Sequence, residues 1–100
     1  MAVNIQKAHR RRKRRLVIKR PVGDTLLLYR LFCEERKGRR FYSISVTKAD
    51  CGGTRRETKL LRDVTSKRED AYRIFDAVSR GLVTPMCADE TVADLLEHYL

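Results

Sequence analysis

The chain has 100 residues, 42% of them hydrophobic and 36% charged, and its formal net charge is +10. This length provides for one small domain, and the hydrophobic content is ordinary for a globular protein, which excludes disorder along the whole chain. The longest apolar runs, residues 16–18 and 26–29, are too short for a secretory signal or a membrane-spanning helix, so we expect a cytoplasmic protein.

The positive charge is concentrated near the N-terminus. Residues 1–23 contain 9 Lys/Arg and no Asp/Glu, whereas residues 24–100 contain 14 Lys/Arg and 13 Asp/Glu. Because like charges repel one another, we expect residues 1–23 to be a basic, largely disordered arm that precedes a small, nearly neutral domain over residues 24–100. Residues 14–19 include three consecutive strand-forming side chains, so an edge strand there is the alternative to disorder.

Three strands are predicted after the arm, over residues 25–35, 41–48 and 57–64. The first has the strongest alternation, and the third has the weakest because Leu60 and Leu61 are adjacent. The polar loop between the first two strands contains one glycine, which tolerates a positive φ. Over the first strand, one face would carry Leu27, Tyr29, Leu31 and Cys33, and the other Leu26, Leu28, Arg30, Phe32 and Glu34.

The apolar residues change from strand spacing to helical spacing at Ser66, and two helices are predicted near residues 67–80 and 86–98. Ser66 and Glu69 have the spacing of a capping box, and Gly81 is expected to end the first helix in the left-handed conformation. Strands followed by helices, with short links between the strands, predict an α+β fold. It would be a three- or four-stranded antiparallel meander followed by two helices packed on one face.

Five short motifs in the predicted domain carry a family resemblance. They are Tyr29-Arg30-Leu31, Tyr42-Ser43-Ile44, Val64-Thr65-Ser66, Val83-Thr84-Pro85 and Asp94-Leu95-Leu96. Together they resemble a family of short, uncharacterised bacterial proteins, chiefly clostridial, that is catalogued as a domain of unknown function. The resemblance covers about residues 25–100 and implies a shared fold, because the matched residues are mostly apolar or helix caps. It implies no activity.

The chain departs from that family's pattern in two places. Ser43 occupies a position where the family has glycine, and Cys87-Ala88 replaces a His-Leu pair. The resemblance therefore implies no histidine ligand or base at this point of the chain. The basic arm lies outside the match, so its function is predicted from its own residues alone.

The basic arm is the strongest functional signal in the sequence. The residues that we assign to nucleic-acid binding are Arg10, Arg11, Arg12, Lys13, Arg14, Arg15, Lys19 and Arg20. A tract of this density attracts RNA or DNA through non-specific phosphate contacts, because each neutralised phosphate releases counterions. RNA fits slightly better, since arginine-rich disordered segments commonly fold on RNA. The alternatives are a solvated tail that aids solubility and, less favoured, an anionic membrane surface.

Two further surfaces are candidates. A secondary basic cluster lies at the predicted turn between the first two strands and comprises Arg36, Lys37, Arg39 and Arg40. An ordinary exposed turn is the more frequent interpretation of such a cluster. Leu26, Leu28 and Phe32 would face away from the helices and form an apolar stripe that requires a cover. That stripe favours a second function, a protein–protein adaptor that binds a partner or a second copy of the chain.

Neither a catalytic site nor a metal site is indicated. Cys33, Cys51, Cys87 and His98 lack the Cys-x-x-Cys spacing that zinc sites usually contain. Cys33 and Cys87 are expected in the core, and Cys51 as an exposed thiol. The sequence also lacks a nucleophile elbow and a glycine-rich phosphate loop. We therefore expect a non-enzymatic protein without a cofactor.

Overall fold

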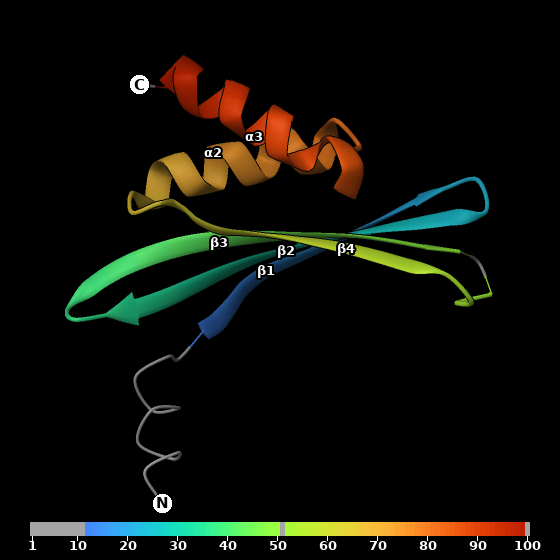
Figure 1. The fold of residues 1–100 in the computed structure, drawn as a ribbon, viewed down its shortest axis with the longest axis horizontal. Helices are drawn as coiled ribbons and strands as arrows, with labels where there is room; N and C mark the ends of the chain where they lie inside the picture. The colour runs from blue at the N-terminus through green and yellow to red at the C-terminus, as the bar shows by residue number, and fades with distance from the viewer. Residues whose placement is uncertain (1–11, 51, 100) are drawn as a thin grey trace, which may run out of the picture.

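The computed structural model describes residues 12–50 and 52–99, which form a four-stranded antiparallel sheet with two helices on one of its faces (Figure 1). The strands pair in sequence order, so the α+β meander predicted from the sequence is confirmed. The elements are β1 (Arg12–Val22), β2 (Thr25–Arg36), β3 (Arg39–Asp50), β4 (Arg56–Thr65), α2 (Arg68–Arg80) and α3 (Pro85–Tyr99). Neither helix has the length and apolar composition needed to cross a membrane.

The edge strand considered as the alternative to disorder over residues 14–19 is present as β1, and it is longer than expected. The sheet begins at Arg12, and β1 pairs with β2 from Arg12 opposite Glu34 to Val22 opposite Thr25. Repulsion within the basic run does not prevent a strand, because β2 satisfies the backbone and the basic side chains reach solvent at the sheet edge. The charges also oppose pairing of this edge with another strand. The rest of the predicted arm, residues 1–11, lies outside the described residues.

The turn between β2 and β3 is tighter than the predicted loop over residues 36–40. Only Lys37 and Gly38 connect the strands, and both have a positive φ, of 51° and 76°. Positive φ at both central residues is the geometry of a type I′ hairpin, which matches the twist of paired strands. Arg36 and Arg39 are therefore strand residues whose side chains have fixed faces of the sheet.

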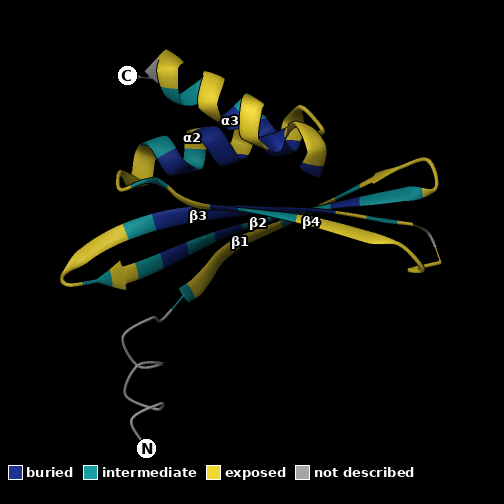
Figure 2. Ribbon diagram, viewed as in Figure 1, coloured by how far each residue is buried: buried dark blue, intermediate teal, exposed yellow. Residues whose placement is uncertain are grey.

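The core lies between the sheet and the helices. The predicted inner face of β2 is confirmed, because its four side chains are buried, and Tyr29 and Leu31 have no exposed surface. Cross-strand pairing sets Leu31 opposite Ile44 on β3. The helices contribute the other half of the core, including Phe75, and Figure 2 shows buried residues along α2 and in the central parts of β2 and β3.

The first helix ends at Arg80 as predicted, but both of its predicted caps differ from the structure. Lys67, not Ser66, is the N-cap, and it makes no side-chain capping bond. The Lys67 N–H instead donates a hydrogen bond to Thr65 Oγ1 at 3.1 Å. The helix begins at Arg68, one residue later than predicted. At the other end Gly81 has a φ of −79°, and Leu82 adopts the left-handed conformation with φ 53°. The Schellman turn therefore closes one residue after the predicted glycine.

Tyr29 links the sheet to the connection between the helices and makes stability sensitive to alkaline pH. Its hydroxyl donates a hydrogen bond to the Val83 carbonyl at 2.8 Å. Burial raises the pKa of Tyr29 above its usual value, and Arg20 partly opposes this shift. Below about pH 10 the phenol is protonated in both the folded and unfolded chains, so its contribution to stability is complete. That contribution is lost as the pH rises through the raised pKa.

We therefore expect Tyr29→Phe to lower the free energy of unfolding by about 1 kcal/mol at neutral pH, because the hydrogen bond is lost. Above pH 10 the variant should lose less further stability than the wild type. Urea unfolding followed by circular dichroism at pH 7, 9, 10 and 11 measures both effects. Parallel losses in the two proteins above pH 10 would assign the alkaline sensitivity to other groups.

Candidate nucleic-acid interface

The sheet face turned away from the helices, hereafter the open face, is strongly basic. Residues that are opposite each other on antiparallel strands lie on the same face of the sheet. Glu34 and Arg12 are opposite each other, and both lie on the open face. Two carboxylates lie there, those of Glu34 and Asp63. The basic side chains on the open face are Arg12, Arg14, Lys19, Arg30, Arg36, Arg39, Arg56 and Arg62.

The charge of the molecule is divided between its two layers. Residues 24–65 contain 10 Lys/Arg and 6 Asp/Glu, whereas residues 66–100 contain 4 Lys/Arg and 7 Asp/Glu. The net charge of residues 24–100 is therefore close to zero because the basic strands and the acidic helical layer offset each other. Together with the basic β1, this division produces a surface potential with a positive side and a negative side.

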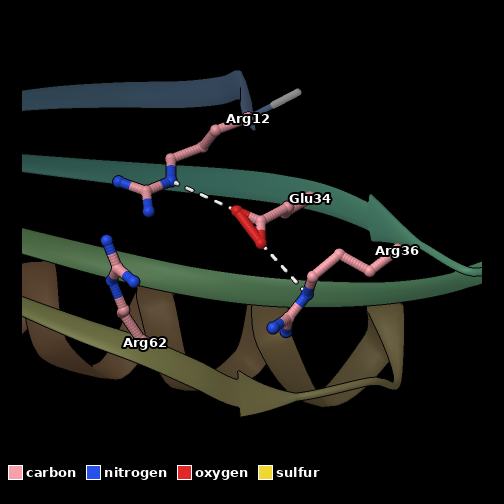
Figure 3. Close-up of a pocket in the computed structure, with 4 residues that line it drawn as sticks. All are labelled: Arg12, Glu34, Arg36 and Arg62. Atoms are coloured by element: carbon pink, nitrogen blue, oxygen red, sulfur yellow. Dashed lines mark ion pairs between the residues drawn. The ribbon is translucent and has the colours of Figure 1, made fainter. Parts of the chain in front are cut away.

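Three arginines and one glutamate line a hollow of about 340 Å³ at one end of the open face (Figure 3). Arg12 comes from β1, Glu34 and Arg36 from β2, and Arg62 from β4. The Glu34 carboxylate lies 3.0 Å from Arg36 Nε and 3.9 Å from Arg12 Nε. Arg62 points toward the same hollow and makes no ion pair with any residue that the structure describes. The hollow therefore has more positive than negative charge.

Arg36 is held in place by its neighbours. Its Nη2 donates a hydrogen bond to Asp63 Oδ1 at 2.6 Å, which raises the pKa of the guanidinium above its usual value. The guanidinium carbon also lies 4.2 Å from the centroid of the Phe41 ring. Asp63 is itself fixed in a bulge at φ 53°, where its N–H donates to Ser43 Oγ at 3.1 Å. Arg36 thus joins β2 to β4 across β3, and its charge is already paired.

Six other basic side chains on the open face make no ion pair with a described residue, so their charges are available to a ligand. All but one of them are exposed, and the exception, Arg30, is half-buried. Neutralising these charges on an anion would break no internal salt bridge. The six are Arg14, Lys19, Arg30, Arg39, Arg56 and Arg62.

Two phenylalanines also lie on the open face, on adjacent strands. Phe32 of β2 is opposite Ser43, and Phe41 of β3 is two residues from Ser43. Both rings are half-buried, and the guanidinium carbon of Arg12 lies 5.7 Å from the centroid of Phe32. The open face therefore combines aromatic rings with arginines near the hollow.

The structure divides the predicted basic tract between two faces. Pairing sets Lys13 opposite Cys33 and Arg20 opposite Leu27, which places both on the helix-facing side of the edge strand. Arg15 lies in a bulge that shifts the register of β1. The open face receives Arg12, Arg14 and Lys19, while Arg10 and Arg11 lie outside the described residues. Alternation along a strand separates side chains that are neighbours in sequence.

The secondary basic cluster is also divided between the two faces of the sheet. In addition, the open face contains a basic residue that was not predicted from the sequence. Arg36 and Arg39 lie on the open face, whereas Arg40 pairs with Glu35 on the other side, and Lys37 is in the turn. Arg62 was not predicted, because isolated charges on separate strands form no visible run. The available signal was the position of Arg62 directly after Leu61, because neighbouring residues of a strand face opposite sides of the sheet.

The apolar stripe proposed as a partner face is less exposed than expected. Leu26, Leu28 and Phe32 lie on the predicted side of β2, but all three are half-buried. Arg12 of the neighbouring strand β1 lies over the Phe32 ring. The large apolar side chains that are exposed in the described part of the chain are Leu16, Val17, Val22, Leu82 and Met86.

The cysteines lie apart from the open face. Cys33 is buried in the core as predicted, but Cys87 is exposed, because α3 turns the neighbouring Ala88 toward the sheet instead. Cys51 lies outside the described residues. Within residues 12–50 and 52–99, no three His, Cys, Asp or Glu side chains are placed to hold a metal ion.

Comparisons with protein-family models, with curated proteins and with solved structures each find no match to this chain. The resemblance to short clostridial proteins therefore stays a prediction. The functional argument depends on the geometry and charge of the open face.

Proposed function

We propose that this protein is a non-enzymatic nucleic-acid-binding protein that contacts phosphates through the open face of its sheet. The observation that carries the proposal is the concentration of eight Lys/Arg on this face, six of them without an ion pair among the described residues. The acidic helical layer lies on the opposite side and would be repelled by the same polyanion, so the charge distribution also orients the protein.

The proposed contacts are to the phosphate backbone of RNA or DNA. Arginine suits this task because its planar guanidinium can donate two parallel hydrogen bonds to phosphate oxygens. Such contacts position a protein without reading the bases, so we expect little discrimination between sequences. Residues 1–11, which precede β1 in the sequence, contain three further Lys/Arg.

Deletion of residues 1–11 tests where binding resides. The truncated chain keeps all of β1, so it should stay folded and should still bind RNA and DNA, although more weakly than the full chain. Electrophoretic mobility shifts at 0.1 M salt, with both proteins and the same labelled oligonucleotides, measure the difference. Complete loss of binding in a folded truncated protein would assign the function to residues 1–11 and contradict the role of the open face.

A protein–protein adaptor is the second candidate function, favoured by one observation. Leu16 and Val17 on the edge strand β1 are each 38% exposed, and the outer edge of β1 has no strand partner among the described residues. An extended segment of a partner could add to this edge. Leu16 is opposite Leu31 and so lies on the helix-facing side of β1, and replacing Leu16 with lysine should then abolish partner binding and spare binding to nucleic acid.

A further inference from the structure

The arrangement around the hollow points to the kind of nucleic acid that the open face accepts. Phe41 has the Arg36 guanidinium 4.2 Å from its ring centroid, and Phe32 has that of Arg12 at 5.7 Å. The two phenylalanines lie on adjacent strands, and Arg62, which has no ion pair with a described residue, lines the same hollow as the two arginines. Flat groups next to available cations are the two components that proteins combine to bind single strands.

The two aromatic–arginine pairs differ in how tightly each arginine is held. Ion pairs with Asp63 and Glu34 hold Arg36, whose guanidinium carbon lies over the Phe41 ring at 4.2 Å from its centroid. Arg12 is held less tightly than Arg36. Its Nε lies 3.9 Å from the Glu34 carboxylate, and its guanidinium carbon lies 5.7 Å from the centroid of Phe32. A base can therefore stack beside the fixed Arg36–Phe41 pair and can displace Arg12 from the Phe32 ring.

We propose that the open face binds single-stranded nucleic acid in preference to a duplex. Unpaired bases stack on the Phe41–Arg36 and Phe32–Arg12 pairs, while Arg62 contacts an adjacent phosphate. This inference rests on the proposed function and adds the ligand's strandedness to it. A duplex presents phosphates to the same arginines, but the faces of its bases are buried against one another and cannot reach the rings.

The test compares a labelled single strand of 12 nucleotides with the duplex of the same sequence, as RNA and as DNA, by fluorescence anisotropy. The wild-type protein should bind the single strand at least several-fold more tightly. Phe41→Leu should lower the single-strand affinity by about 5- to 150-fold, which is the usual effect of losing one stacked base, and should leave the duplex affinity unchanged. Phe41→Tyr keeps an aromatic ring and should retain the preference.

Tyr72→Leu is the matched control. Tyr72 also carries an arginine, with the guanidinium carbon of Arg68 at 5.4 Å from its centroid, but it lies in the helical layer. Its replacement should change neither affinity. Thermal unfolding of each variant shows whether the protein used in the binding assay is folded.

Equal wild-type affinities for single strand and duplex would overturn the stacking inference and leave phosphate binding intact. So would equal losses for both ligands in Phe41→Leu. Absence of binding to every oligonucleotide would overturn the proposed function as well. Separate affinities for the RNA and DNA single strands show which of the two the open face accepts more readily.

Discussion

Replacing Phe75 with alanine should lower the free energy of unfolding by about 3–5 kcal/mol. The side chain is 1% exposed and belongs to the core between α2 and the sheet. Alanine there removes the ring and leaves a cavity that the surrounding side chains fill only in part. Native domains are typically stable by about 5–15 kcal/mol, so this loss threatens folding of so small a protein.

Urea unfolding followed by circular dichroism measures this effect. Met86→Ala is the control, because Met86 is 85% exposed and its truncation should change the free energy of unfolding by less than about 0.5 kcal/mol. If the Phe75→Ala protein were as stable as the Met86→Ala protein, the result would contradict the placement of Phe75 in the core.

Neutralising three available arginines of the open face should lower the affinity for nucleic acid by roughly 200-fold at 0.1 M salt. The variant combines Arg14→Gln, Arg39→Gln and Arg62→Gln, and none of these side chains is ion-paired with a described residue. Each phosphate contact releases about 0.7–0.9 counterion, which corresponds to about sixfold in affinity at this salt concentration. Stability should change little, because no internal salt bridge is broken.

The matched control removes the same charge from the helical layer, by Lys67→Gln, Arg68→Gln and Arg80→Gln. These three side chains are exposed and lie at or within α2, away from the open face. If only net charge mattered, both triple variants would lose affinity equally. The proposed interface requires a much larger loss in the open-face variant, and equal losses would contradict it.

The sheet was predictable where one face of a strand is buried. Alternation over β2 identified Tyr29 and Leu31 as core residues because the helices cover that face alone. The first residues of β1 were not predictable from charge, since repulsion within the basic run does not reveal that β2 pairs with it. Arg12 is stabilised there by Glu34 and Phe32, which are distant in sequence.

The candidate site was predictable only in part, for a related reason. The basic run and the turn cluster each supplied arginines to the open face, but Arg62 comes from a separate strand and joins Arg12, Glu34 and Arg36 at the hollow only in the folded sheet, next to a bulge that shifts the register between β3 and β4. Asp63, at its positive φ, is part of the same bulge. Bulge position depends on packing between strands, which the order of residues along one strand does not reveal.

The salt dependence of binding tests the proposed interface most directly. With five or six of the available open-face side chains engaged, the logarithm of the observed association constant should depend linearly on the logarithm of the salt concentration. The observed association constant should fall with a slope of roughly −4 to −5, and the open-face triple variant should reduce that slope by about 2–3. Anisotropy titrations between 50 and 300 mM salt measure both slopes. An association constant that does not change with salt, or an equal slope in the wild type and the open-face variant, would contradict phosphate binding by the open face.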